Sequence, residues 1–342
     1  MRMQMRGAVQ VLVALVLATA CGGGTSPIAT TSPTPATLFD DHFGFLIGNA
    51  VRLESDSKTA FTLGIPNDSG GVVSPDGHRL AYWDKNALRV IDIAANARPR
   101  TLLTLTAKGE TAYYFAWSSD GTGLVVGVNG GGGGMADAPP GYTAVRVVDL
   151  AGGRAREIVR VKFASVIPLT WDRQAHLITG YRPSGAGAQE YYVIEEGGKL
   201  KSSPTAQGAY VVEASHDGQQ VLGRGASDSV VRVWPRSSYA SGVDLRATAD
   251  ERILWAAWRP GTAEIGVLFA DRLELWNASG ARRAIPLPPH ASGKSFLVFR
   301  ADGKSVFALG VEVIAVDIAS GRTTIVDWPS GLPQPGTSVR IS

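Results

Sequence analysis

One short segment of sequence recurs at a nearly constant interval along this 342-residue chain. Its strongest copies, each with Asp-Gly before an apolar run, span residues 74–82, 118–126, 215–222 and 300–307. Two weaker copies begin at Trp171 and Arg259. The interval averages about 45 residues, which is the length of a four-stranded propeller blade. Because Asp-Gly between two apolar runs is a strong β-hairpin signal, each copy predicts two antiparallel strands joined by a turn.

A second recurring segment follows each turn and predicts the third strand of each copy. Clear examples occupy residues 88–92, 145–149, 230–234, 273–277 and 314–317. No segment shows a convincing helical period, and the 41 glycines, about 12% of the chain against about 7% in average proteins, suit many tight turns. We therefore expect an all-β fold in which four recurring aspartates are structural turn residues: Asp76, Asp120, Asp217 and Asp302.

Both ends of the repeat region predict a ring that closes on itself. Residues 43–48, 51–54 and 59–63 match the last three strands of a blade whose innermost strand is absent, and residues 337–341 form one extra strand after the last complete copy. Pairing the extra strand with the first blade leaves no open sheet edge. We therefore predict that residues 38–342 form a seven-bladed β-propeller of four-stranded antiparallel blades, closed by the C-terminal strand completing the first blade.

The repeat resembles the WD-repeat and TolB-type propeller families, whose blades carry a Ser-Pro-Asp-Gly turn followed by Leu-Ala-aromatic, as residues 74–82 do. Gly-His before the blade and Trp-Asp at its end are missing, so the bacterial TolB-type version is the more similar. The resemblance implies a propeller that binds partners. Some members of the family place the propeller over a hydrolase domain, but because this chain ends where the ring closes, we expect no hydrolase to follow.

The N-terminus carries an export signal. Arg2 and Arg6 precede a short apolar run over residues 8–20, which is too short to span a bilayer. The junction at residues 17–21 resembles the lipobox of bacterial lipoproteins, with Ala18 where Leu is commonest, and this resemblance implies that Cys21 is lipidated. A plain secretory signal cleaved near Ala20 is the alternative. We expect residues 1–20 to be removed, residues 21–37 to be a flexible tether, and the protein to face the periplasm or cell exterior from the cell membrane or outer membrane.

Composition and motifs exclude several function classes. The single cysteine excludes an internal disulfide and any cysteine-based zinc site, and the net charge of +3 gives no reason to expect a nucleic-acid partner. There is no Gly-x-Ser-x-Gly elbow, no His-Glu-x-x-His and no phosphate-binding loop. Four of the five histidines lie near a first turn in different blades, so they cannot converge on one metal: His42, His78, His176 and His216, with His290 the fifth. We expect no metal, no cofactor and no catalysis.

Glu213 is the residue that departs most sharply from the repeat. The equivalent positions on the other innermost strands hold Val72, Ala116, Ala257 and Val298, all apolar. Because a buried carboxylate is costly unless it is paired, we expect either a structural ion pair with Arg224 or Arg259, or a binding site that faces the central channel.

A second candidate surface is the rim that carries the loops between blades and between second and third strands. It has mixed charges and one aromatic residue, which suit a polar protein or glycan: Asp84, Lys85, Tyr181, Arg182, Asp250, Glu251 and Arg252. A glycine-rich loop over residues 129–142 lies on the same rim and is either a disordered insertion or a flap over the channel.

These observations favour a monomeric, lipid-anchored, non-catalytic binding or scaffold protein for a protein or glycan partner. One alternative is a propeller enzyme of the lyase or lactonase type with a metal in the central channel, which would need several inward-facing acids. Another is an accessory subunit of a membrane sensor or transport complex.

Overall fold

The computed structural model describes residues 42–54, 57–67, 71–131, 141–182, 189–248, 251–277, 279–288, 296–310, 312–326, 328 and 337–341. The chain divides into two units, Met1–Ala36 and Thr37–Ser342, and every described residue belongs to the second. The export signal, Cys21, the predicted tether, Asp250, His290 and residues 132–140 of the glycine-rich loop therefore lie outside the described residues.

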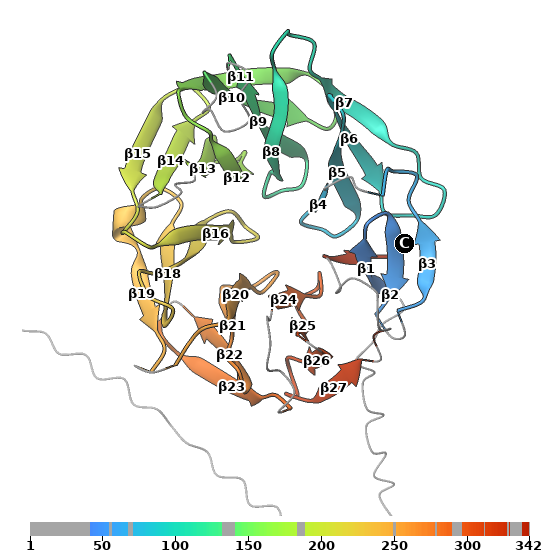
Figure 1. Cartoon of the computed structure of the whole chain (residues 1–342), viewed down its shortest axis with the longest axis vertical. Helices are drawn as coiled ribbons and strands as arrows, with labels where there is room; N and C mark the ends of the chain where they lie inside the picture. Colours follow the sequence, from blue (N-terminus) through green and yellow to red (C-terminus); the bar gives the residue numbers. More distant parts are fainter. Residues whose placement is uncertain are drawn as a thin grey trace, which may run out of the picture. The chain divides into compact units, whose positions relative to one another are not determined.

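The described strands form seven four-stranded sheets arranged as a ring (Figure 1), and the innermost strands surround the central channel that is typical of propellers. All neighbouring strands within each sheet are antiparallel, so the predicted all-β, seven-bladed fold is confirmed. The innermost strands, in order from blade one to blade seven, are β28 (Ser338–Arg340), β4 (Gly71–Val73), β8 (Thr111–Trp117), β12 (Ile167–Asp172), β16 (Tyr210–Ala214), β20 (Trp255–Trp258) and β24 (Phe296–Phe299).

The other three strands of each blade lead outward from the channel. The second strands are β1 (Phe43–Ile47), β5 (Arg79–Asp84), β9 (Gly123–Gly130), β13 (Leu177–Arg182), β17 (Gln220–Arg224), β21 (Glu264–Leu268) and β25 (Ser305–Leu309). The third strands are β2 (Ala50–Leu53), β6 (Ala87–Asp92), β10 (Tyr142–Asp149), β14 (Glu190–Glu195), β18 (Val230–Pro235), β22 (Arg272–Asn277) and β26 (Val313–Asp317). The outermost are β3 (Thr59–Thr62), β7 (Arg100–Thr104), β11 (Ala155–Lys162), β15 (Leu200–Pro204), β19 (Val243–Arg246), β23 (Arg282–Pro286) and β27 (Thr323–Val326).

The C-terminal strand closes the ring, as the sequence predicts. In blade one, β28 pairs antiparallel with β1, and the register places Val339 opposite Gly44. Two further main-chain hydrogen bonds extend this pairing, from the Leu46 N–H to the Thr337 carbonyl at 3.0 Å and from the Ile341 N–H to the His42 carbonyl at 2.8 Å. The last strand therefore covers a sheet edge that the first three strands of the fold would otherwise expose.

Three of the four Asp-Gly turns share one hydrogen-bond pattern, which explains why this segment recurs, and in the fourth the Arg300 guanidinium replaces the serine hydroxyl. In blade three the Ser118 hydroxyl donates to Asp120 at 2.6 Å, and the Asp120 carboxylate accepts the Thr122 N–H at 3.0 Å. Gly121 has a φ of +67°, a left-handed conformation that glycine adopts without strain. Burial alone would raise the pKa of Asp120, but the hydrogen bonds from Ser118 and Thr122 outweigh it and hold the pKa below its usual value.

The hydrophobic core consists of layers between adjacent blades. One layer, for example, joins Leu88 of blade two to Leu124 and Val126 of blade three, all fully buried. Face-to-face packing of twisted sheets excludes water from both faces of each blade, and this burial is the main force that stabilises the ring. The only helix among the described residues is a single 3-10 turn, η1 (Tyr239–Ser241), and none of them forms a helix long and apolar enough to cross a membrane.

Candidate functional site: a cavity beside Glu213 in the central channel

Two adjoining cavities lie against the innermost strands of blades five to seven. Their volumes are about 520 and 270 Å³, and they share part of their lining. The shared residues come from three innermost strands and the segments that follow them, and from the residue before β28: Glu213, Trp258, Pro260, Phe299 and Thr337. The smaller cavity also reaches Ser74 of blade two, so it extends across the channel.

Glu213 lies on β16 beside a bulge that shifts the register of its pairing with β17. Its Oε1 accepts a hydrogen bond from the main-chain N–H of Trp258 on the neighbouring blade. Because β20 is the innermost strand of blade six, this N–H lies on a sheet edge and has no strand partner on the channel side. The carboxylate thus links blades five and six at the channel wall.

The predicted arginine partners of Glu213 are wrong. Arg224 forms an ion pair with Asp228, and Arg259 forms one with Glu264. Each arginine has an acid four or five residues away in the same blade, and this local acid outcompetes a carboxylate on an inner strand. Glu213 forms no ion pair with any described residue, and the main-chain N–H of Trp258 is the donor that it binds.

The environment of Glu213 raises the pKa of its carboxyl group above the usual glutamate value. Desolvation by the surrounding strands raises its pKa to about 7, and the hydrogen bond from Trp258 offsets only part of this rise. His216, which lines the smaller cavity, is also perturbed. Desolvation lowers the pKa of His216, although the carboxylates of Asp217 and Asp76 act in the opposite direction. Near neutral pH, Glu213 therefore exchanges between charged and neutral forms while His216 is mainly neutral.

Aromatic side chains form one wall of the larger cavity. Trp255 at the start of β20 and Phe296 at the start of β24 meet edge to face, with ring centroids 4.7 Å apart. Phe296 is 43% exposed, which is unusual for a phenylalanine and places apolar surface where a ligand can reach it. Trp258 is buried, and its Nε1–H has no hydrogen-bond partner among the described residues.

The sequence carries a signal for this wall that reasoning from the turns alone overlooks. Tyr114, Trp255 and Phe296 occupy the same repeat position, six residues before the turn position that Asp120, Gly261 and Asp302 share. The structure places a tyrosine pair at the first of these positions. Tyr113 and Tyr114 meet edge to face at 4.7 Å, and Tyr114 is 53% exposed. An aromatic residue thus recurs at this position in three innermost strands.

The residues predicted on the binding rim come from separate parts of the ring. They lie in blades two and four and in the connection between blades five and six, and most of them are engaged locally. The pairs are Asp84–Arg89 at 3.1 Å, Arg182–Glu190 at 3.8 Å, Glu251–Arg272 at 2.6 Å and Arg252–Asp228 at 3.3 Å.

Two of the described rim residues remain outside these ion pairs. Lys85 is exposed in the turn between β5 and β6, with a left-handed φ of +55°. Tyr181 lies near Tyr113 and Tyr114, and burial is the main cause that raises its pKa. Tyr181 therefore belongs to the tyrosine cluster rather than to a charged surface.

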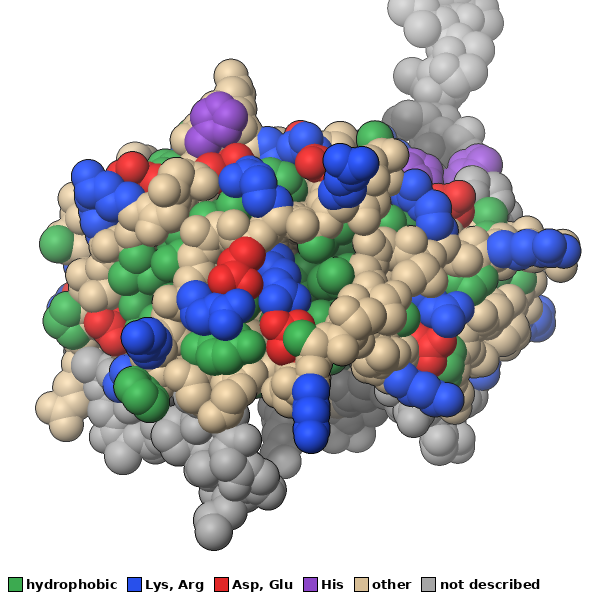
Figure 2. All heavy atoms as spheres, turned by 90° about the horizontal axis from the view of Figure 1, so that it is seen from above, with side chains coloured by type: hydrophobic (Ala, Val, Ile, Leu, Met, Phe, Trp, Pro, Cys, Tyr) green, Lys and Arg blue, Asp and Glu red, His purple; other side chains and the backbone are tan. Residues whose placement is uncertain are grey.

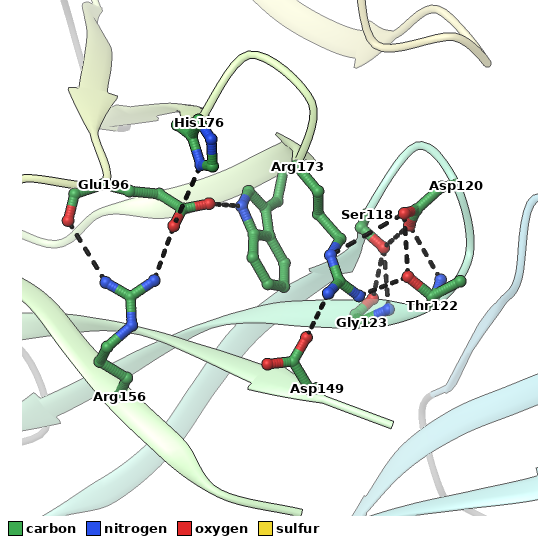
Figure 3. Close-up of polar contacts among 10 residues, drawn as sticks. Ser118, Asp120, Thr122, Gly123, Asp149, Arg156, Arg173, His176 and Glu196 are labelled. Carbon is green, nitrogen blue, oxygen red and sulfur yellow. Dashed lines mark hydrogen bonds and ion pairs between the residues drawn. The ribbon is translucent and has the colours of Figure 1, made fainter. Parts of the chain in front are cut away.

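A third cavity, of about 670 Å³, is lined by Arg79 and Arg100 of blade two and by Arg173 of blade four, and each of these arginines already has a local partner. Figure 3 shows Arg173 between two acids, Asp149 at 2.7 Å and Asp120 at 3.8 Å. Arg100 donates to the Leu150 carbonyl at 2.7 Å. These contacts join neighbouring blades, so we interpret this cavity as a structural junction.

The histidines lie as the sequence predicts, along a rim rather than at one point. The edge-on view of the ring shows the histidine side chains on one rim, while acidic and basic side chains alternate over the outer wall (Figure 2). Within the described ranges, no three His, Cys, Asp or Glu side chains come together in a group that could hold a metal ion.

Comparison with known proteins identifies the fold. No protein-family model matches the sequence, and no curated protein matches it. The chain is similar to a prolyl endopeptidase at 15% identity and a TM-score of 0.57, covering 88% of this chain and 49% of that one. This chain therefore spans about half the length of that enzyme.

Two further solved structures share the architecture. A chain of the mitotic checkpoint complex matches at 15% identity and a TM-score of 0.50, covering 92% of this chain and 87% of its own. Oligogalacturonate lyase in complex with manganese matches at 14% identity and a TM-score of 0.50, covering 79% and 78%. At these identities the likenesses establish a WD40-like β-propeller, a fold that serves both enzymes and proteins of larger assemblies.

Proposed function

We propose that this protein is a lipid-anchored, extracytoplasmic β-propeller that binds a partner at its channel and catalyses no reaction. The observation that carries the proposal is the cavity beside Glu213, where an aromatic wall adjoins an acid that has no basic partner among the described residues. Concave, mostly apolar cavities with few polar groups are the usual form of ligand sites.

The chemistry of the cavity favours binding over catalysis. Acid–base hydrolysis of a glycoside, for example, requires two carboxyl groups on either side of the reacting bond. Among the described residues, Glu213 is the one acid that lines the larger cavity, and the lining of the smaller cavity adds His216 as a second titratable group. A single carboxyl group with aromatic neighbours can orient and neutralise a ligand without a partner acid.

The membrane anchor of the proposal rests on the sequence around Cys21. A lipidated N-terminal cysteine carries several acyl chains, and each buried CH₂ contributes about 0.8 kcal/mol to membrane binding, so such an anchor is stable where a single chain would not be. Metabolic labelling with an alkyne fatty acid tests it directly. Label is expected on the wild-type protein and not on Cys21→Ser, and equal labelling of both would contradict the anchor.

Site-specific photocrosslinking in intact cells tests the binding function. A photoreactive residue at position 255 is expected to capture a specific partner protein, whereas one at Arg154, an exposed residue of the turn between β10 and β11, is expected to capture none. A glycan partner would leave both positions without a captured protein, and binding of oligosaccharides to the purified protein would then identify it. If no protein is captured and no glycan binds, the proposal is contradicted.

Metal analysis distinguishes binding from the enzymatic alternative. A lyase or lactonase with a channel metal would retain stoichiometric Ca²⁺, Mn²⁺ or Zn²⁺ through purification. The proposed binding function predicts substoichiometric metal and no change in partner capture after treatment with a chelator.

A further inference from the structure

The larger cavity combines one carboxyl group with a wall of aromatic rings. Glu213, Trp255, Phe296 and Phe299 all line it, and the Trp255 and Phe296 rings are in edge-to-face contact. Its volume of about 520 Å³ lies within the range of roughly 300–1,000 Å³ that is typical of small-molecule sites. The cavity is therefore large enough for a small organic group and has both polar and apolar recognition elements.

The charge of the carboxylate is uncompensated in the part of the chain that the structure describes. The two arginines that the sequence offers as partners, Arg224 and Arg259, pair with Asp228 and Glu264. Trp258 contributes a neutral N–H. The other titratable group facing the channel at this point is His216, and desolvation lowers its pKa, so it supplies little positive charge near neutral pH.

An ionised carboxylate in a partly dehydrated, apolar cavity requires a counter-charge. A cation that carries carbon substituents would supply it and would also be attracted to the negative faces of the aromatic rings. A bare divalent metal does not suit the site, because Ca²⁺ takes six to eight oxygen ligands and the cavity offers a single carboxylate.

We propose that this cavity binds an organic ammonium group, with the nitrogen cation against Glu213 and its carbon substituents against Trp255 and Phe296. This inference rests on the proposed binding function and names the chemical class of ligand for the same site. An ammonium group reaches such a site either on a quaternary amine, as in choline and choline lipids, or on a primary amine, as in a lysine side chain.

Calorimetric titration of the full-length protein in detergent tests the inference with a matched pair of ligands. Choline and 3,3-dimethylbutan-1-ol have nearly the same shape, but only choline carries a charge. We expect choline to bind at least tenfold more tightly than the neutral alcohol. Lysine amide, titrated in parallel, distinguishes a primary ammonium source from a quaternary one, because tighter binding of one identifies which the cavity prefers.

The titratable carboxyl adds a second readout. A bound cation favours the ionised form of Glu213, so proton release accompanies binding and affinity rises with pH. With a pKa of about 7, the fraction ionised grows about tenfold between pH 6 and pH 8, and the affinity for choline is expected to rise by the same factor. The neutral alcohol is expected to show no such dependence.

Three variants separate recognition from folding. Glu213→Gln preserves the size of the side chain and is expected to abolish both the preference for choline and its pH dependence. Trp255→Ala is expected to weaken choline binding at least fivefold. Tyr114→Ala changes an exposed aromatic residue that does not line the cavity, and it is expected to leave choline affinity within twofold of wild type. Circular dichroism of each variant verifies that the propeller is folded.

Equal binding of choline and the neutral alcohol, or an unchanged preference in Glu213→Gln, would overturn the inference. If neither choline nor lysine amide binds while position 255 still captures a partner or a neutral oligosaccharide binds, the ammonium inference fails and the binding function stands. If no ligand binds and position 255 captures nothing, both fail.

Discussion

Two equivalent junctions between neighbouring blades use different hydrogen bonds. Between blades two and three, the Trp117 Nε1–H donates to the main-chain carbonyl of Val72 at 2.8 Å. Between blades five and six, the equivalent pair is Glu213 and Trp258, also 45 residues apart. Here the contact involves the Glu213 carboxylate and the Trp258 main-chain N–H, while the Trp258 Nε1–H has no partner among the described residues.

Because the blades repeat, a position whose contacts differ from those of its equivalents in other blades is a candidate functional position. At the first junction a main-chain carbonyl satisfies the indole N–H, and the contact holds two blades together. At the second, the Trp258 indole N–H has no partner among the described residues, and the Glu213 carboxylate has a main-chain N–H but no basic group. A buried polar group without a partner costs about 1–3 kcal/mol, so an arrangement that retains this unpaired N–H sacrifices stability at that point. Such a sacrifice is typical of a ligand site.

Opening the ring is expected to have the largest effect, because both junctions depend on its closure. Deleting residues 337–342 removes β28 and exposes the edge of β1. We expect a loss comparable to the whole free energy of folding, about 5–15 kcal/mol for a typical domain, seen as the absence of a cooperative thermal transition. Deletion of Ser342 alone is the control. A truncated protein that melts like wild type would show that the junctions do not require closure.

The next largest effect is the pH dependence of stability at the second junction. The folded-state pKa of Glu213, about 7, is raised above its unfolded value, so its contribution to stability is present at low pH and is lost as pH rises through 7. Glu213→Gln removes this loss. Because the side chain is only half-buried, we expect the variant to gain about 1–3 kcal/mol over wild type between pH 5 and pH 8.

Urea unfolding at both pH values measures this gain, and Val72→Gln at the equivalent position of the first junction provides the control, with no expected pH-dependent difference. Parallel stability curves for wild type and Glu213→Gln would contradict the assigned environment of Glu213.

The smallest effect comes from the two tryptophans. Trp117→Phe and Trp258→Phe remove the same indole N–H from equivalent positions, but only Trp117 uses it in a hydrogen bond within the described residues. We expect Trp117→Phe to cost about 1 kcal/mol more in the free energy of unfolding, the usual net value of one hydrogen bond. Equal losses in both variants, measured by chemical denaturation, would mean that the two junctions are equivalent after all.

The fold was predictable because the same turn sequence recurs in several blades. Each Asp-Gly turn specifies the same hairpin through local hydrogen bonds, and the regular spacing of such turns left little choice of architecture. Closure was also predictable, since three strands without an innermost partner at one end matched a single strand at the other.

The site was only partly predictable. Glu213 stood out because it replaces an apolar residue, but its partner did not, because a main-chain N–H on a strand edge leaves no trace in the side-chain sequence. Arg224 and Arg259 were plausible partners until the structure placed nearer acids beside them. The rim charges were grouped by topology alone, and their ion pairs with neighbouring residues could not be predicted from the repeat.

The pKa of Glu213 tests most directly whether a desolvated carboxyl group in the cavity binds a cation. Carbon-13 NMR of protein labelled at glutamate carboxyl carbons, with Glu213→Gln to assign the signal, follows the ionisation of this one group. We predict a midpoint near pH 7 without ligand and a clear fall when choline is added. A midpoint near the ordinary glutamate value of about 4.3, unchanged by choline, would contradict the account.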